Sequence, residues 1–222
     1  MTGGFFVTGT DTGCGKTEIT LGLMHRLQQD GLIVQGLKPV AAGAEETPQG
    51  LRNDDALRIQ QQCSLDVPYK QVNPFVYAPP IAPHLAAEEE GCPIQTNKIC
   101  EVFNQLVAMS DRVIVEGAGG WQVPLGSDIT ISGLVKMLNL PVILVVGMKL
   151  GCINHAILTA ENIRQSGVEL HGWVANHIAP AMQAQEGNLK ALSEWLSAPC
   201  LGEVPYLEQP TAEKVSGFLV RL

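Results

Sequence analysis

The sequence is poor in positive charge and has no long apolar run. Its 222 residues carry 14 Lys and Arg against 22 Asp and Glu, a net charge of -8, without the basic block that neutralises nucleic-acid phosphates. The apolar run at residues 140–146 is far shorter than the roughly 20 residues that span a bilayer. The start, Met-Thr-Gly-Gly, also lacks the basic residues of a signal peptide. These absences predict a cytoplasmic protein with no nucleic acid and no membrane as a partner.

The cysteines form no recognisable pattern. The six are scattered, with no C-x-x-C pair and no Cys/His cluster, so the sequence predicts neither a zinc site nor a disulfide framework. We expect reduced thiols, most of them buried as small hydrophobic side chains. Cys14 and Cys152 lie in glycine-bearing loops, so a reactive thiol there stays an open alternative, with no catalytic role assigned.

What the sequence does contain is an alternation of two periodicities. Short apolar runs predict strands at residues 5–9, 34–40, 112–116, 142–147 and 170–176. Helical periods predict helices at residues 16–30, 54–62, 96–109, 129–138, 153–166 and 185–196. This alternation indicates an α/β fold with a mostly parallel sheet. Residues 142–146 are apolar on both faces, as in a central strand that helices cover on two sides. We expect one domain over residues 1–222.

Two long segments lack either period. Residues 41–53 read as irregular, and residues 66–93 contain six prolines that predict a stiff, extended chain rather than a helix. Long loops of this kind are usually functional or mobile. The second segment is therefore either a surface connection or a lid that faces a substrate, and the sequence favours neither.

The turn between the first strand and the first helix has the composition of a phosphate-binding loop. Residues 9–17 read Gly-Thr-Asp-Thr-Gly-Cys-Gly-Lys-Thr. Gly13 and Gly15 would let backbone N–H groups converge on phosphate oxygens at a helix N-terminus. Lys16 would reach the terminal phosphates and the Thr17 hydroxyl would bind Mg²⁺. The alternative is an ordinary glycine-rich turn. The motif predicts an ATP- and Mg²⁺-dependent enzyme with a P-loop NTPase-like fold, a three-layer sandwich.

A bound Mg²⁺ also needs an acidic ligand, usually at the end of a strand. Glu116 closes the strand at residues 112–116 and precedes Gly-Ala-Gly-Gly, which makes it the first candidate. Asp55 is the second, with Asp54 as the competing choice. The bland alternative for the two aspartates is a helix N-terminus, which suits acidic side chains.

Two lysines outside the loop stand near the ends of predicted strands. Lys38 would emerge at the carboxyl edge of the sheet, where open parallel sheets bind ligands, and could neutralise a phosphoryl group or hold an anionic substrate. Its alternative is a surface lysine. Lys149 precedes a glycine turn whose N–H groups could hold a carboxylate. His155 in the same segment reads as a structural histidine.

Five segments carry a family resemblance over nearly the whole chain. They are Phe6-Val7-Thr8-Gly9-Thr10-Asp11-Thr12 with Gly15-Lys16-Thr17, Lys38-Pro39-Val40, Arg52-Asn53-Asp54-Asp55-Ala56-Leu57, Val115-Glu116-Gly117-Ala118-Gly119-Gly120-Trp121 and Leu150-Gly151-Cys152-Ile153-Asn154-His155. In this order they resemble the signatures of the dethiobiotin synthetases, the ATP-dependent carboxylase-cyclases of biotin synthesis.

The resemblance implies a homodimer and a role for each matched residue. The implied Mg²⁺ ligands are Thr17, Asp55 and Glu116. The implied catalytic residues are Lys38 and Lys16. The implied ATP contacts are Gly13, Cys14, Gly15, Lys16, Thr17, Glu18, Asp55, Glu116, Gly117, Ala118, Gly119, Asn176, His177, Pro205, Tyr206 and Leu207. The implied substrate contacts are Thr12, Lys38, Ala42 and, from the partner subunit, Gly151, Cys152 and Asn154.

The chain departs from the family pattern at two of these positions. The family often has glutamate in place of Gly13 and serine in place of Ala42, so both positions lose side-chain contacts. Near the C-terminus, Glu208 and Glu213 compete for the place of one family glutamate.

The resemblance also implies the reaction. Carbon dioxide adds to one amine of 7,8-diaminononanoate, the carbamate takes the γ-phosphoryl group of ATP, and the neighbouring amine closes a cyclic urea. The products are dethiobiotin, ADP and phosphate. One rival is a switch-type P-loop ATPase that binds partner proteins, but Asp11 stands where such relatives commonly carry a lysine. Another is an amidating synthetase of corrinoid assembly, for which the chain is too short.

Overall fold

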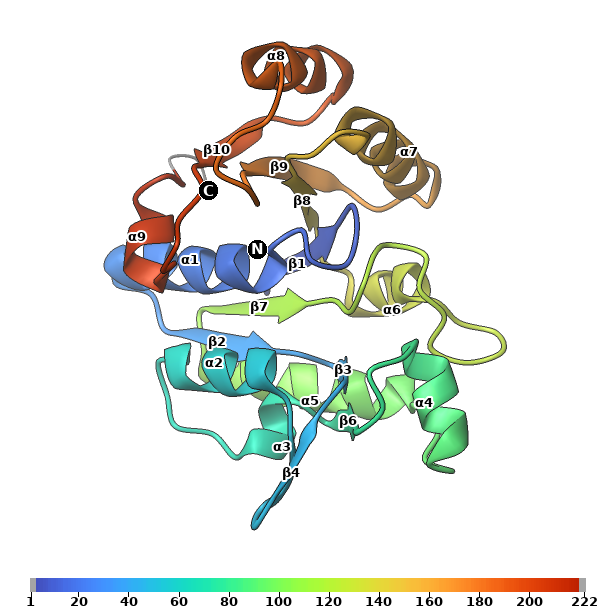
Figure 1. Ribbon diagram of the computed structural model, residues 1–222. Coiled ribbons are helices and arrows are strands. Elements are labelled where there is room, and N and C mark those ends of the chain that lie inside the picture. The colour runs from blue at the N-terminus through green and yellow to red at the C-terminus, as the bar shows by residue number, and fades with distance from the viewer. Residues whose placement is uncertain (1–2, 220–222) are drawn as a thin grey trace.

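A six-stranded parallel sheet forms the middle layer of the computed structural model, which describes residues 3–219 (Figure 1). The strands lie in the order β10-β9-β8-β1-β7-β2. Their bounds are β1 Gly4–Gly9, β2 Val34–Leu37, β7 Arg112–Glu116, β8 Val142–Gly147, β9 Leu170–Asn176 and β10 Cys200–Val204. Because every neighbouring pair is parallel, all six carboxyl ends lie at the same edge of the sheet.

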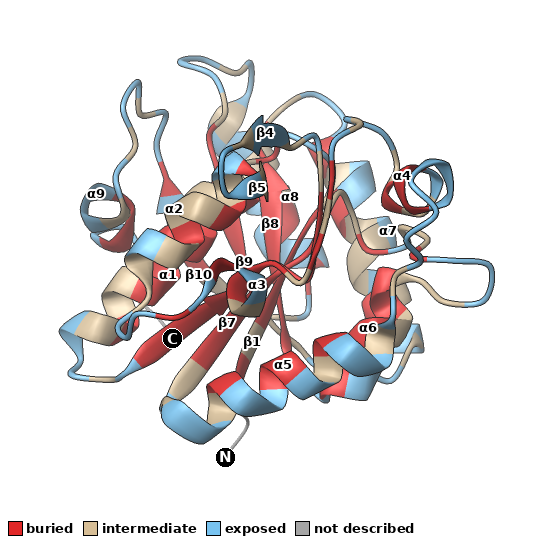
Figure 2. Ribbon diagram, turned by 90° about the horizontal axis from the view of Figure 1, so that it is seen from below, coloured by how far each residue is buried: buried red, intermediate tan, exposed pale blue. Residues whose placement is uncertain are grey.

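Helices cover both faces of this sheet (Figure 2). One face carries α1 Lys16–Gln29, α2 Asp54–Gln62 and α9 Ala212–Ser216, and the other carries α5 Thr96–Met109, α6 Ile131–Leu138 and α7 Cys152–Gln165, with α8 Gln185–Trp195 packed against α7. The side chains from Val142 to Val146 are fully buried, as expected for a strand with no wet face. The predicted α/β fold, with a mostly parallel sheet between helices, is confirmed.

Smaller elements extend the carboxyl edge of the sheet. β3 Val40–Ala42 pairs with β6 Phe75–Tyr77 in a parallel two-stranded sheet, and β4 Glu45–Thr47 pairs with β5 Gly50–Arg52 in an antiparallel hairpin. Two short helices follow in the same part of the chain, α3 Tyr69–Val72 and α4 Pro83–Glu89. None of the described helices has the length and apolar character to cross a membrane.

Several expectations about local structure are wrong. The strand expected at residues 34–40 ends at Leu37, because the chain leaves the main sheet and enters the small one. Residues 41–53 contain the β4–β5 hairpin, and residues 66–93 are partly helical. The prolines explain the second error: Pro68 caps α3 and Pro83 begins α4, and proline is well tolerated at a helix start. β10 and α9 were not predicted.

The cysteines also differ from the expectation that most are buried. The side chains of Cys14 and Cys152 are buried, those of Cys63, Cys100 and Cys200 are partly exposed, and that of Cys92 is exposed. Cys92 lies in the turn after α4, where the surrounding residues 88–93 face solvent. The burial of each cysteine therefore depends on the segment in which it lies, and the residue type alone does not predict it.

Candidate active site

The loop between β1 and α1 contains two glycines with a left-handed backbone conformation. Gly13 and Gly15 have φ angles of 75° and 86°, in the left-handed region that glycine adopts without strain. At Gly15 a side chain would also require the Asn176 amide to move, since a Cβ would lie 2.0 Å from its Nδ2 atom. The same amide donates to the carbonyl oxygen of Cys14 at 2.9 Å. The loop thus enters α1 with the unpaired N–H groups of a helix start beside it.

Lys16 and Asp11 tie the loop together. The buried Lys16 ammonium donates to the carbonyl oxygen of Asp11 at 3.1 Å. The Asp11 carboxylate accepts hydrogen bonds from Lys149 at 2.7 Å and from the Thr12 N–H at 2.8 Å, and these two bonds lower its pKa. Lys149, which precedes the glycine turn at the start of α7, thus pairs with the phosphate loop. Both side chains are partly exposed, and a pair of this kind adds little stability.

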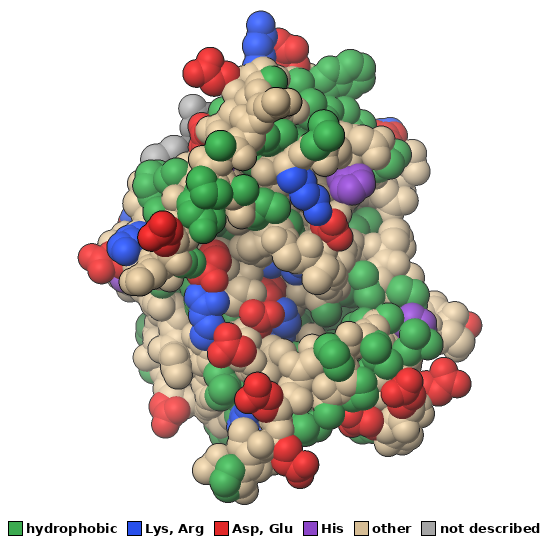
Figure 3. Space-filling model, viewed as in Figure 1, with side chains coloured by type: hydrophobic (Ala, Val, Ile, Leu, Met, Phe, Trp, Pro, Cys, Tyr) green, Lys and Arg blue, Asp and Glu red, His purple; other side chains and the backbone are tan. Residues whose placement is uncertain are grey.

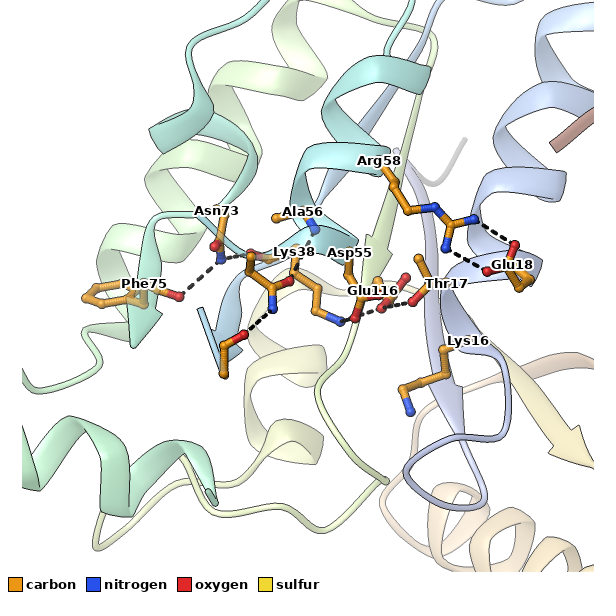
Figure 4. A network of polar contacts seen from close by, with 12 residues as sticks. Lys16, Thr17, Glu18, Lys38, Asp55, Ala56, Arg58, Asn73, Phe75 and Glu116 are labelled. Atoms are coloured by element: carbon orange, nitrogen blue, oxygen red, sulfur yellow. Dashed lines mark hydrogen bonds and ion pairs between the residues drawn. The ribbon is translucent and has the colours of Figure 1, made fainter. Parts of the chain in front are cut away.

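Four side chains from four segments meet beside the loop (Figure 4). Thr17 comes from the first turn of α1, Lys38 follows β2, Asp55 lies in the first turn of α2, and Glu116 ends β7. The Thr17 hydroxyl donates to Oε1 of Glu116 at 3.1 Å. The Lys38 ammonium donates to Oδ2 of Asp55 at 3.1 Å and to Oε1 of Glu116. The structure therefore brings the two acids and the lysine that the sequence singled out into one cluster.

The charges in this cluster stabilise one another. Burial disfavours the charged form of Lys38, but the negative charges of Glu116 and Asp55 outweigh burial, and the pKa of Lys38 is raised. Burial likewise raises the pKa of Asp55, but attraction by Lys38 and a hydrogen bond from Thr17 outweigh it, and its pKa is lowered. Lys38 and Asp55 are therefore both ionised at neutral pH.

The cluster has the ligand types that Mg²⁺ prefers. Glu116 is fully buried, and its Oε2 atom has no hydrogen-bond partner within residues 3–219. A buried carboxylate oxygen without a partner is costly unless a cation or water satisfies it. The Thr17 hydroxyl and the Asp55 and Glu116 carboxylates supply hard oxygen atoms, and Mg²⁺ commonly takes one or two carboxylates together with water and phosphate oxygens. These residues fit a Mg²⁺ ion.

A cavity of 730 Å³ opens over the cluster and appears as the hollow at the centre of Figure 3, with acidic and basic side chains inside it. It is lined by Thr12, Gly13, Gly15, Lys16, Thr17, Glu18, Lys38, Ala41, Ala42, Asn53, Asp55, Arg58, Pro80, Ile81, Ala82, Pro83, Glu116, Ala118, Gly119 and Val123. Its volume lies within the usual range for small-molecule sites. The mixture of phosphate loop, cations and carboxylates suits a phosphorylated ligand beside a second small molecule.

A second cavity of 180 Å³ adjoins the first. It is lined by Gly15, Glu18, Asn176, His177, Ile178, Val204, Pro205, Tyr206, Leu207, Pro210 and Val215. Gly15 and Glu18 line both cavities, so the two spaces meet at the start of α1. The second cavity is formed after β9 and β10 and is largely apolar, which suits a flat heterocyclic base. Five of the expected ATP contacts therefore lie near one another in the structure, namely Asn176, His177, Pro205, Tyr206 and Leu207.

Some expected residues lie elsewhere. Gly151, Cys152 and Asn154 stand at the start of α7 and line neither cavity of this chain. Gly117 borders a small apolar space behind Glu116. The Cys14 side chain is buried, so only the backbone of this loop residue is available to a ligand.

Sequence reasoning missed other cavity residues. Arg58 donates two hydrogen bonds to the Glu18 carboxylate, at 2.6 and 2.8 Å, and forms part of the wall near the loop. Its spacing of three from Asp55 on α2 places both on one helix face, a signal that could have identified it. Residues 80–83 also line the cavity, so this part of the proline-rich segment faces the site. Asn53 joins them as the cap of α2.

Comparison with known proteins gives two kinds of match. The family model described as an AAA domain matches residues 3–214. The ATP-dependent dethiobiotin synthetase BioD of Pseudomonas aeruginosa is 52% identical over 216 residues, which cover 97% of this chain and 95% of that relative. The ATP-dependent dethiobiotin synthetase BioD 1 of Escherichia coli is 44% identical over 218 residues, 98% and 97% of the two chains.

Solved structures match more distantly. The septum site-determining protein MinD of Pyrococcus horikoshii, complexed with Mg-ADP, superposes with a TM-score of 0.56 at 15% identity, over 96% of this chain and 85% of that one. A ParA family ATPase of Chlorobium tepidum gives 0.54 at 12% identity, over 98% and 91%. At these identities the match shows the fold alone.

Proposed function

Because the chain belongs to the family of ATP-dependent dethiobiotin synthetases, we propose that the two joined cavities are the active site of that reaction. The chain has dethiobiotin synthetase activity, a ligase activity of biotin biosynthesis that consumes ATP. A switch-type ATPase is the alternative function, because the chain shares its fold with MinD and a ParA family ATPase. Those proteins are only 12% to 16% identical to this chain, whereas the two synthetases are 52% and 44% identical to it.

The reaction joins three small molecules in one space. One amine of 7,8-diaminononanoate takes up carbon dioxide to form a carbamate. A carbamate oxygen then attacks the γ-phosphorus of ATP, and ADP leaves. The second amine attacks the carbonyl carbon of the mixed anhydride, so that phosphate leaves and the cyclic urea forms. Each step moves negative charge, and the protein contributes by holding the reactants and neutralising that charge.

The residues at the floor of the large cavity divide this work. The phosphate loop, from Gly13 to Glu18, holds the triphosphate through its N–H groups, and Lys16 turns from the Asp11 carbonyl to the terminal phosphates. Lys38 is positively charged in the cavity wall and binds the carbamate and the phosphoryl group in transfer. Thr12 and Ala42 border the diamine, where the missing hydroxyl at Ala42 leaves its polar contacts to Lys38, backbone groups or water.

Thr17, Asp55 and Glu116 would hold Mg²⁺. When bound, the ion supplies positive charge that neutralises the phosphate oxygens during transfer. In this structure the Lys38 ammonium donates to both carboxylates.

The small cavity would hold the adenine of ATP. Asn176 supports the loop through Cys14 and borders the base, while Pro205, Tyr206 and Leu207 contribute an edge of apolar surface. His177 is buried and pairs with Glu203 at 2.8 Å, so its ring is fixed in the cavity wall.

The substrate carboxylate would be bound by a second copy of the chain. Leu150 is 96% exposed, and Gly151 and Asn154 beside it are also exposed. These positions at the start of α7 can contact a partner subunit, and the helix N-terminus suits a carboxylate. A homodimer with a shared site therefore accounts for residues that line no cavity of their own chain.

The location of the protein in the cytoplasm also stays a prediction.

Subunit mixing tests the shared site. Lys38→Ala and Asn154→Ala would each inactivate every site of a homodimer. After the two variants are unfolded together and refolded, half of the dimers should contain one intact site, which restores roughly one quarter of wild-type turnover. Light scattering measures the oligomeric state of each sample. A monomer, or a mixture that regains nothing while wild type refolds, would disprove the shared site.

The observation that carries the proposed site is the meeting of Lys38, Asp55 and Glu116 beside the phosphate loop. Lys38→Ala should still bind ATP, measured by calorimetry, but should lose formation of the cyclic urea, measured by mass spectrometry with bicarbonate, Mg²⁺ and the diamino acid. The matched control is Lys98→Ala, which removes an exposed lysine paired with Glu101 on α5. Turnover by Lys38→Ala close to that of the control would refute the assigned role.

A further inference from the structure

The backbone of Lys38 lies in a gap between two sheets. β2 ends at Leu37 in the main sheet and β3 begins at Val40 in the small one. Pro39, the next residue, has no N–H to donate. Buried backbone groups at such a gap need partners from outside a strand ladder. The segment from Val72 to Phe75 provides them.

Asn73 is the centre of these contacts (Figure 4). Its Nδ2 atom donates to the carbonyl oxygen of Lys38 at 2.7 Å and to that of Phe75 at 3.1 Å. The Lys38 N–H donates to the carbonyl oxygen of Val72 at 2.7 Å. Asn73 is 1% exposed, so these bonds have no competition from water. The main chain of the lysine is thus held at both its donor and its acceptor.

Tyr69 links Asn73 to helix α2. The tyrosine hydroxyl donates to Oδ1 of Asn73 at 2.9 Å and accepts from the N–H of Asn53 at 2.9 Å. Asn53 caps α2, and Asp55 lies in the first turn of that helix. The buried Tyr69 hydroxyl therefore connects helix α2, which carries Asp55, to Asn73, which binds the backbone of Lys38.

We propose that Tyr69 and Asn73 are positioning residues of the synthetase reaction, because their hydrogen bonds fix the place of the Lys38 ammonium relative to the Asp55 carboxylate. The inference rests on the proposed roles of those two residues. Tyr69 and Asn73 do not line the large cavity, so they act through their neighbours. A displacement of about 1 Å in an active site can lower turnover about 100-fold.

Two substitutions test this series of hydrogen bonds with little change in side-chain shape. Tyr69→Phe removes one hydroxyl and keeps the ring, over which Arg52 lies at 4.3 Å. Asn73→Asp replaces the amide donor with an oxygen that repels the Lys38 carbonyl. The matched control is Tyr77→Phe, since the Tyr77 hydroxyl is also buried and donates to the carbonyl oxygen of Cys92 at 2.7 Å.

The expected result is a loss of kcat without a loss of nucleotide binding. We expect kcat for the cyclic urea to fall about 10-fold in Tyr69→Phe and about 100-fold in Asn73→Asp. The KM for ATP should stay within about threefold of wild type, because the phosphate loop keeps its contacts. Tyr77→Phe should keep wild-type kcat. Thermal unfolding of each variant shows whether a kcat change accompanies a loss of stability.

Three results would count against the proposal. Wild-type kcat in both Tyr69→Phe and Asn73→Asp would overturn it, and so would an equal loss in Tyr77→Phe, or a rise in the KM for ATP that accounts for the whole effect. Lys38→Ala, measured beside them, separates this inference from the proposed site. If Lys38→Ala retains turnover, the role of the lysine fails. If it loses turnover while the other two retain it, only the positioning role fails.

Discussion

Removing the charge of Glu116 should destabilise the protein before any ligand is added. Glu116→Gln keeps the shape of the side chain, but it leaves the Lys38 ammonium, 4% exposed, with Asp55 as its remaining charged partner. Breaking a buried ion pair on one side costs about 3–5 kcal/mol. The Asp55 side chain is 39% exposed and stays in place, so we expect the lower end, about 3 kcal/mol. For a chain of this length that corresponds to a fall in Tm of roughly 6–12 °C.

The assay is thermal and urea unfolding in the presence of a chelator and without nucleotide. Lys38→Met and the double variant Lys38→Met/Glu116→Gln complete a double-mutant cycle. We expect the double variant to be more stable than the sum of the single effects by about 2–3 kcal/mol, because it leaves neither charge buried alone. Glu161→Gln, which breaks an exposed pair with Arg164, is the control and should change stability by less than about 0.5 kcal/mol. Additive single effects, or a Glu116→Gln variant as stable as the control, would refute the reasoning.

Three further predictions concern nucleotide, metal and thiols. Gly15→Ala should weaken ATP binding about 100-fold in calorimetry, because the new methyl group would collide with the Asn176 amide. Gly13→Ala has open space around the methyl group, so its loss of binding free energy should be only the backbone strain of its φ angle, about 1–2 kcal/mol. Equal losses of ATP binding in the two variants would contradict this account of the loop. Removal of divalent cations with a chelator should abolish formation of the cyclic urea, and added Mg²⁺ should restore it; full activity in the chelator would disprove the metal site. At pH 8 a maleimide should label the exposed Cys92 before Cys63 in a mass-spectrometric time course, because burial raises the pKa of Cys63 to about 11 and keeps its thiol protonated. Labelling of Cys63 should accelerate as the pH rises towards its pKa. Equal labelling rates of Cys92 and Cys63 at pH 8 would show that the Cys63 thiol is not protected.

The sequence predicted the frame of the site because charged residues at the ends of apolar runs are easily recognised. Glu116 closes an apolar run and Lys38 follows one, and parallel topology then places both at the same edge of the sheet. The phosphate loop was clear for the same reason, since its glycines lie between a strand and a helix. These features depend on local sequence and one topological rule.

The remaining features depend on contacts between distant segments. Nothing local in Asn73 indicates that its amide replaces the missing ladder bond of Lys38. The two-stranded sheet of β3 and β6 forms between segments too short to show a period. The prolines of residues 66–93 predict an extended segment because proline usually interrupts helices, whereas Pro83 begins a helix. Such choices are made by tertiary packing.

The position of β1 has a consequence for the order in which the enzyme matures. β1 comes first among the described strands, yet it pairs with β7 on one side and β8 on the other, both of which lie far later in the sequence. On a ribosome, the nucleotide loop would therefore sit on an unsupported strand until residue 147 has emerged. Binding of ATP would thus report that β7 and β8 have been synthesised, and fragments that stop before β8 should be unable to bind it.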